Sequence, residues 1–166
     1  MLGHVGATAM KNVHPKKQML LAIRDLRHVI VSNLRFVRKR SGHESAQSAL
    51  KPEDLIAFME SAHPANTFAF TMAQEAVDLL NDAQVVRFEE LVSDDPEQRS
   101  RSVQSFVAVT ECSTEEVSQA IERAIGQETM TYSGQQTELL PSLWTKEVED
   151  CFVCKDGYVL NKRLGY

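Results

Sequence analysis

The stretch of residues 18–40 constrains the fold of this chain more than any other. It begins with a short apolar run, residues 19–23, which is typical of a buried strand. After Arg24 and Asp25, apolar residues recur every three or four positions, which is typical of a helix. We therefore predict a strand over about 18–24, followed by a helix over about 26–40 with Asp25 as its N-cap.

The distribution of charge points to a local anion site. Residues 1–40 contain nine Lys and Arg and one acid, whereas residues 41–166 contain nine Lys and Arg and twenty-two acids. A basic end on an acidic body favours a local anion site over general nucleic-acid binding, and no zinc-finger spacing or aromatic-basic interleaving supports the latter. The longest apolar runs, about five residues, are far short of the ~20 that a membrane span needs.

Three cysteines are too few for a disulfide framework, so we expect a reducing, cytoplasmic compartment. Cys151 and Cys154 have C-x-x-C spacing, but the sequence has no second such pair, and its last histidine is His63. We therefore expect two half-buried cysteines on one helical face rather than a redox or metal site.

The remaining pattern alternates helices with one further strand. Pro52 suits the first position of a helix, and Ser113 with Glu116 forms a capping-box pattern. Residues 126–141 are predicted to be irregular, and a tail over 157–166 follows the last predicted helix. Two strands make a very small sheet, so either short strands escape the pattern or the chain belongs to a larger sheet. The predicted helices are 52–61, 67–80, 97–109, 114–125 and 146–155, and the second strand is 83–88.

The candidate ligands for an anion are Arg24 and Ser32. Arg24 ends a predicted buried strand, where α/β sheets bind ligands, and its planar fork can donate two parallel hydrogen bonds to a phosphate. Ser32 shares a helical stripe with His28, Arg35 and Lys39. An equally weighted alternative is that Arg24 pairs with an acid and the helix presents a solvated basic face.

The run from Ile23 to Asn33, IRDLRHVIVSN, resembles the "RDPRDVxVS" segment of the sulfotransferase family. Arg24 and Ser32 are eight positions apart, as in that family, where the pair binds the 3′-phosphate of 3′-phosphoadenosine 5′-phosphosulfate. Leu26 and His28 depart from the family's Pro and Asp, which are not the phosphate ligands.

Later segments resemble the family in the same order. Residues 85–91, VVRFEEL, are similar to "VxRYEDL", with Phe88 in place of Tyr, and residues 102–109 are similar to the helix "IxxFLG". Residues 132–145 resemble the glycine-rich nucleotide loop only poorly; Gly134 is kept, but the Arg-Lys pair and a second glycine are missing. The resemblance therefore implies Phe88 and Gly134 as further cofactor-binding residues.

The resemblance also implies a catalytic base. The family's general base is a histidine about twenty residues before the phosphate-binding Arg, which implies His4 in this chain. The alternative, equally weighted, is that His4 is a terminal residue with no role.

The resemblance implies a single domain over residues 1–166 with a P-loop-NTPase-like parallel sheet flanked by helices. It implies sulfuryl transfer from 3′-phosphoadenosine 5′-phosphosulfate, the co-substrate, to a hydroxyl or amine of a small molecule or sugar. The sequence has no counterpart of the "PKSGTTW" loop that binds the 5′-phosphosulfate. We therefore expect the C-terminal part of such a domain, supplying the 3′-phosphate-binding half.

Two alternatives stay open. One is a non-catalytic, degenerate nucleotide-binding or interaction module that self-associates through an exposed sheet edge. The other is an unrelated α/β domain with a solvated basic helix.

Overall fold

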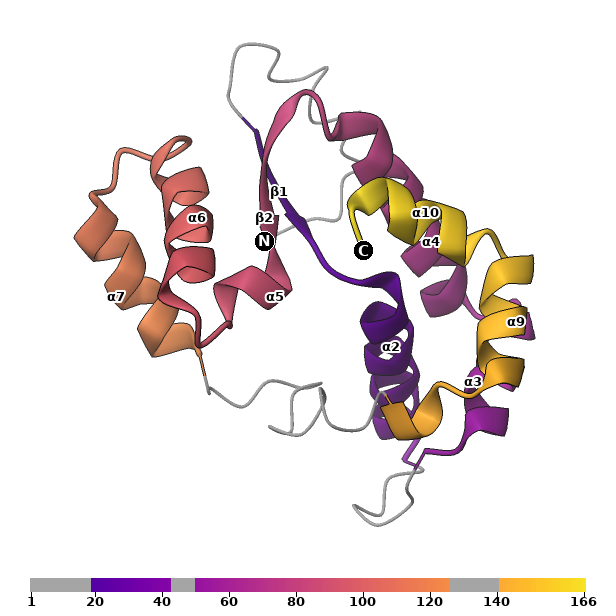
Figure 1. Ribbon diagram of the computed structural model, residues 1–166. Coiled ribbons are helices and arrows are strands. Elements are labelled where there is room, and N and C mark those ends of the chain that lie inside the picture. The colour runs from indigo at the N-terminus through magenta and orange to yellow at the C-terminus, as the bar shows by residue number, and fades with distance from the viewer. Residues whose placement is uncertain (1–18, 43–49, 126–140) are drawn as a thin grey trace. The chain divides into compact units, whose positions relative to one another are not determined.

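A computed structural model describes residues 19–42, 50–125 and 141–166 of the chain, which are mainly helical with one small parallel sheet (Figure 1). These residues fall into two compact units, each described by itself below. The combination of helices with parallel strands confirms the general α/β class. The elements are β1 (Met19–Ile23), α2 (Leu26–Arg40), α3 (Pro52–Glu60), α4 (Pro64–Leu79), β2 (Ala83–Arg87), α5 (Phe88–Leu91), α6 (Pro96–Val107), α7 (Thr114–Ala124), α9 (Lys146–Cys154) and α10 (Gly157–Leu164).

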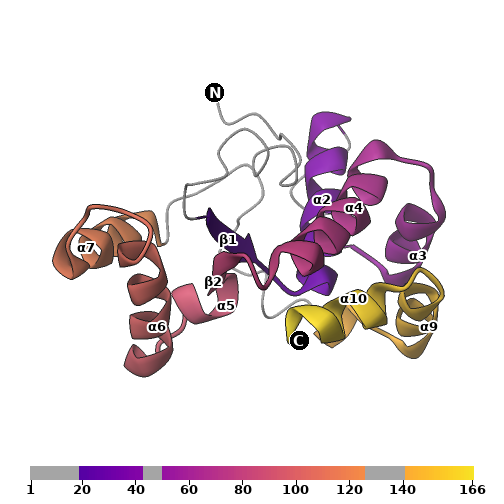
Figure 2. The same ribbon diagram turned by 90° about the horizontal axis from the view of Figure 1, so that it is seen from above.

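The first unit contains β1, Arg24 and the chain from Gln74 through α7. Its two strands pair in parallel, with Met19 opposite Ala83 and Ile23 opposite Arg87. Parallel strands need a long crossover, and here the chain between them includes α2, α3 and α4. Helix α6 packs against β2 and α5, and α7 packs against α6 (Figures 1 and 2).

A small apolar cluster joins α6 to α7. Val103 of α6 and Val117 and Ile121 of α7 are buried, and Leu91 and Phe106 pack against them. The predicted capping box at the start of α7 is confirmed. The Ser113 hydroxyl accepts from the Glu116 amide at 3.3 Å, and the Glu116 carboxylate accepts from the Ser113 amide at 2.8 Å.

The second unit contains α2, α3, the first part of α4, α9 and α10. Helix α9 contacts α3 and α10, and α2 also contacts α3 and α10 (Figure 2). Each helix turns apolar side chains inward at helical spacing, which is the condition for a shared core. The most deeply buried of these side chains are Leu26, Ile30, Leu55, Met59, Val148 and Phe152.

The predicted bounds of the first strand and helix are confirmed within a residue. The Asp25 side chain accepts from the Arg27 amide and caps α2. Pro52 occupies the first turn of α3 as predicted.

Helix α4 begins at Pro64, three residues before the predicted start. The His63–Pro64 pair lies after the end of α3, and proline is tolerated at the first position of α4, where its missing N–H has no partner to lose. His63 caps this turn, because its Nδ1 accepts from the Ala65 amide at 3.1 Å and its carbonyl accepts from the Asn66 amide at 2.9 Å.

The tail from Gly157, for which we predicted no helix or strand, forms α10. Asp156 just before it has the left-handed φ of 61°, which turns the chain between α9 and α10. Gly157 is buried against the Phe152 ring, and a Cβ at this position would overlap that ring. This glycine therefore permits close packing of the two helices.

The C-x-x-C pair lies on α9, with both thiols free. Cys151 is half-buried as expected, but Cys154 is exposed, so the expectation of two half-buried cysteines is wrong for the second. Within the described ranges, no group of three or more His, Cys, Asp or Glu is placed to hold a metal ion. None of the helices described is long and apolar enough to cross a membrane.

Candidate functional site

The carboxyl ends of the two parallel strands bring an arginine and an aromatic ring together. Arg24 directly follows β1 and Phe88 directly follows β2, so the parallel register places them at the same edge of the sheet. The Arg24 Cζ lies 4.4 Å from the centroid of the Phe88 ring. This is a cation–π arrangement, in which the ring holds one face of the guanidinium plane.

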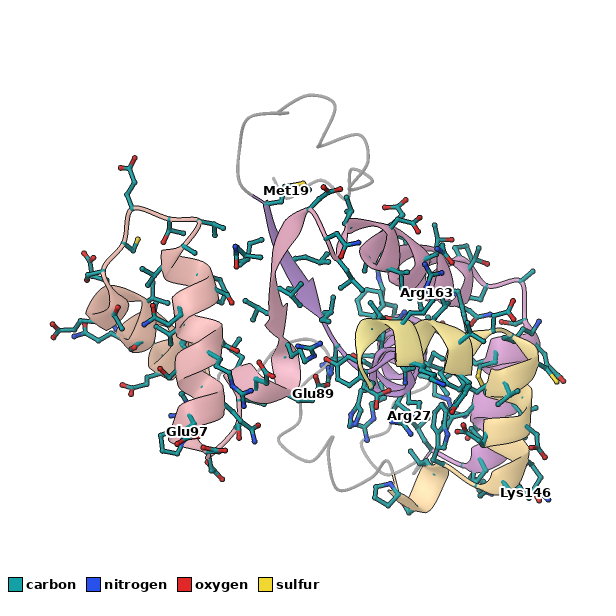
Figure 3. All side chains as sticks on the ribbon, turned by 45° about the horizontal axis from the view of Figure 1, so that its top comes forward. Met19, Arg27, Glu89, Glu97, Lys146 and Arg163 are labelled. Atoms are coloured by element: carbon teal, nitrogen blue, oxygen red, sulfur yellow. The ribbon has the colours of Figure 1, made fainter. Side chains whose placement is uncertain are left out.

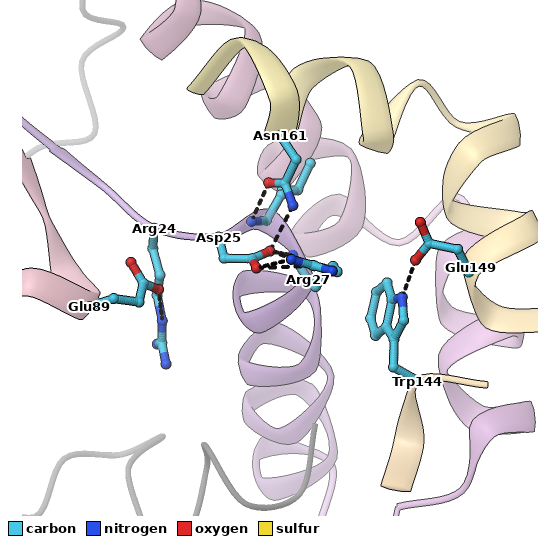
Figure 4. Close-up of polar contacts among 8 residues, drawn as sticks. Arg24, Asp25, Arg27, Glu89, Trp144, Glu149 and Asn161 are labelled. Atoms are coloured by element: carbon cyan, nitrogen blue, oxygen red, sulfur yellow. Dashed lines mark hydrogen bonds and ion pairs between the residues drawn. The ribbon is translucent and has the colours of Figure 1, made fainter. Parts of the chain in front are cut away.

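An acid from the same turn also contacts this guanidinium. The Arg24 Nε lies 3.8 Å from Oε1 of Glu89, the second residue of α5 (Figure 4). A charge-assisted hydrogen bond is about 2.7–2.9 Å long, so this ion pair is loose. In Figure 3, the labelled Glu89 lies where the chain leaves β2. Of the two sequence interpretations of Arg24, the one in which it pairs with an acid is therefore seen in the structure.

The stacking of Arg24 on Phe88 determines the direction from which an anion can approach the guanidinium. A ring occupies the face of the guanidinium plane, whereas its N–H donors lie in the plane and point to its rim. A phosphate or carboxylate can therefore approach in the plane without displacing Phe88. The Arg24 side chain is 21% exposed and that of Glu89 is 35% exposed, whereas the Arg24 Nε atom itself is buried.

Ser32, the second predicted phosphate ligand, lies in α2 and is half-buried. It belongs to the second unit, whereas Arg24 belongs to the first. The stripe around Ser32 is only partly solvated, because His28 and Arg35 are half-buried and Lys39 is exposed.

A buried polar network fixes the first turn of α2 in the second unit (Figure 4). Asn161 of α10 donates to Oδ1 of Asp25 at 2.8 Å and accepts from the Leu26 amide at 2.8 Å. Arg27 holds the other side of the carboxylate, with Nε at 3.0 Å from both oxygens and Nη2 at 2.6 Å from Oδ2. Asp25 and Asn161 are only 6% and 4% exposed.

This network controls the ionisation of Asp25. Burial alone raises the pKa of the carboxyl group, but the hydrogen bonds from Arg27 and Asn161 outweigh it, and the pKa of Asp25 lies below its ordinary value. The hydrogen bond to Asp25 in turn raises the pKa of Arg27, with a further contribution from the charge of Glu149. Asp25 is therefore held as an anion.

The network continues toward the start of α9. The Trp144 Nε1 donates to the Glu149 carboxylate, and the indole packs edge-on against Phe152 with centroids 5.4 Å apart. The Thr145 hydroxyl accepts from the Val148 amide at 3.5 Å and caps α9. Trp144 and its neighbours therefore serve to join α9 to the core of the second unit.

The structure brings together only part of the predicted site. The Phe88 ring stacks on the Arg24 guanidinium. Phe88 is the first residue of α5, whereas we predicted it to be the last residue of the second strand. His4 and Gly134 lie outside the described residues. Sequence reasoning missed Glu89 as the partner of Arg24; the signal was an acid directly after the second of two parallel strands.

Comparison with known proteins supplies no further assignment. No protein-family model matches this sequence, and no curated protein and no solved structure matches it.

Proposed function

We propose that this chain binds the 3′-phosphate of 3′-phosphoadenosine 5′-phosphosulfate through Arg24 and Ser32. It thereby supplies the 3′-phosphate-binding half of a sulfuryl-transfer site in a P-loop-NTPase-like domain. The observation that carries the proposal is the Arg24 guanidinium stacked on Phe88 at the carboxyl edge of the β1–β2 pair.

The position of Arg24 supports a phosphate ligand. Ligands of open α/β sheets bind beyond the carboxyl ends of the strands, which is where Arg24 and Phe88 meet. Stacking on the ring restricts the long arginine side chain before any ligand arrives, which lowers the entropy lost on binding. Phe88 therefore acts as a support for the phosphate-binding cation.

Ser32 enters the proposal from its spacing. It follows Arg24 by eight positions, as the phosphate-binding serine does in the sulfotransferase pattern. A hydroxyl adds a neutral donor, which would not repel a cation that binds the same phosphate. Ser32 is half-buried in α2.

The reaction would be an in-line displacement at sulfur, in which the acceptor hydroxyl or amine attacks and the nucleotide leaves as a 3′,5′-bisphosphate. Such a transfer depends on prepositioned cations and amide groups that stabilise the charge on the transferring group. His4 is the candidate for removing the acceptor proton. Arg24 and Ser32 act by positioning the nucleotide.

Calorimetric titration with 3′-phosphoadenosine 5′-phosphate tests the proposal. We expect binding to the full chain, and a loss of about 1.5–3 kcal/mol in Arg24→Ala, the scale of a hydrogen bond to a charged group. Ser32→Ala should lose less, about 0.5–1.5 kcal/mol. Arg101→Ala, which removes an exposed arginine of α6, is the control for net charge.

A second ligand makes this test specific to the 3′-phosphate. Adenosine 5′-phosphate lacks that group, so its affinity should be weak and insensitive to Arg24→Ala. If wild type does not bind the 3′,5′-bisphosphate, or if Arg24→Ala and Arg101→Ala weaken binding equally, the proposal is wrong.

One observation favours the alternative of a non-catalytic module. The described residues form a sheet of only two strands, and such small sheets gain stability from additional strands or helices. A module of this kind would bind nucleotide without transferring sulfate and would self-associate. Sulfuryl-transfer assays with small hydroxyl and amine acceptors, run beside light scattering, separate the two functions.

A further inference from the structure

We propose that the Glu89 carboxylate is an internal competitor for the anion that Arg24 binds, so that the ion pair sets the affinity of this site. The inference rests on the proposed function in that the competing anion is the nucleotide's 3′-phosphate. Both partners belong to the first unit.

The positions of the two groups support competition. Phe88 stacks on one face of the guanidinium at 4.4 Å, and the Glu89 carboxylate lies 3.8 Å from its Nε. A phosphate that binds Arg24 through Nε and one Nη would use the edge of the guanidinium that faces Glu89. On either edge, the phosphate and the Glu89 carboxylate would be like charges at one cation, so the carboxylate opposes the binding of the phosphate.

The strength of the ion pair allows exchange. Its 3.8 Å separation and the 35% exposure of Glu89 place it among partly exposed pairs, which contribute little to stability. A phosphate dianion carries more charge and offers more oxygen acceptors than a carboxylate. The nucleotide therefore displaces Glu89, at a cost in affinity equal to the free energy of the broken pair.

The neighbouring residue provides a matched control. Glu90 also lies in the first turn of α5, and its Oε1 is 4.0 Å from the Arg87 Nη1. Glu89→Gln and Glu90→Gln each remove one negative charge from the same turn of the same helix. Only Glu89→Gln removes the carboxylate from Arg24.

The experiment titrates wild type and both variants, as full chains, with 3′-phosphoadenosine 5′-phosphate and separately with inorganic phosphate. We expect Glu89→Gln to bind each anion about two- to five-fold more tightly than Glu90→Gln, the range that an ion pair of this kind contributes. In an Arg24→Ala background, the difference between the two glutamine variants should disappear.

The outcomes separate this inference from the proposed function. If all three proteins bind the nucleotide with equal affinity, Glu89 is no competitor and the proposed function stands. If the nucleotide fails to bind but Glu89→Gln gains affinity for inorganic phosphate over Glu90→Gln, the competitor stands and the proposed function fails. If none of the three proteins binds either anion, the competition by Glu89 and the proposed function are both wrong.

Discussion

Replacing the buried Asn161 by alanine should strongly lower the free energy of unfolding of the second unit. The substitution removes two hydrogen bonds of 2.8 Å, one to the Asp25 carboxylate and one from the Leu26 amide. Asp25, Leu26 and Asn161 are all buried, so water cannot replace the lost partner without opening the structure. The start of α2 would thus lose its connection to α10.

The magnitude follows from the two groups left behind. A buried N–H without an acceptor costs about 1–3 kcal/mol, and a hydrogen bond to a charged group contributes about 1.5–3 kcal/mol. Arg27 continues to hold both carboxylate oxygens, which puts the second loss at the low end. We expect the free energy of unfolding to fall by roughly 2–4 kcal/mol at pH 7.

Urea unfolding followed by Trp144 fluorescence measures this loss. Trp144 is the one tryptophan of the sequence and packs on Phe152 in the second unit, so its emission reports on that unit. With a urea slope of about 2 kcal/mol/M, the midpoint should fall by about 1–2 M. Asn81→Ala, at an exposed position, is the control. A midpoint for Asn161→Ala that matches the control would refute the assigned role of the network.

The pH dependence adds a second check. Because the folded pKa of Asp25 lies below its unfolded value of about 3.9, the carboxylate stabilises the fold above that value. That contribution is lost as the pH falls through the folded pKa. The difference between wild type and Asn161→Ala should therefore be constant near neutral pH and shrink below about pH 4, as the charged acceptor disappears.

Two further predictions concern the α9–α10 hairpin. Gly157→Ala should lower the free energy of unfolding by about 1–3 kcal/mol, because the added methyl group overlaps the buried Phe152 ring; a variant as stable as wild type in urea would contradict the close packing. A thiol reagent should modify exposed Cys154 before Cys151, since burial, and then the charge of Glu60, raise the pKa of the half-buried Cys151 thiol. Peptide mapping after a short reaction reads the order, and equal labelling of the two would be the contrary result.

The parts of this fold that the sequence predicted are those with local signals. Asp25 before an apolar periodic stretch, Pro52 at a helix start and the Ser113–Glu116 box each act within one turn of chain. Such signals depend on hydrogen bonds between near neighbours, so a single sequence contains all the information they need.

The parts that it missed depend on contacts between different helices. Helix α10 was not predicted, because Gly157 owes its place to the Phe152 ring of the preceding helix. Asn161 had no signal, because its partners Asp25 and Leu26 are more than a hundred positions away. Of the candidate site, Arg24 was predicted from the end of a strand and Phe88 from the sulfotransferase resemblance, whereas the contact of Glu89 with Arg24 depends on the parallel pairing of two strands distant in the sequence.

The interleaving of the two compact units has a consequence for synthesis on the ribosome. Each unit combines two separate stretches of the chain, and the second unit needs α10, which follows everything else described. The first unit has all its described elements once α7 has emerged, although β1 must wait for β2, because Met19 pairs with Ala83. We therefore expect a nascent chain to close the β1–β2 ladder early, while Asp25 and the start of α2 stay without Asn161 until α10 has emerged.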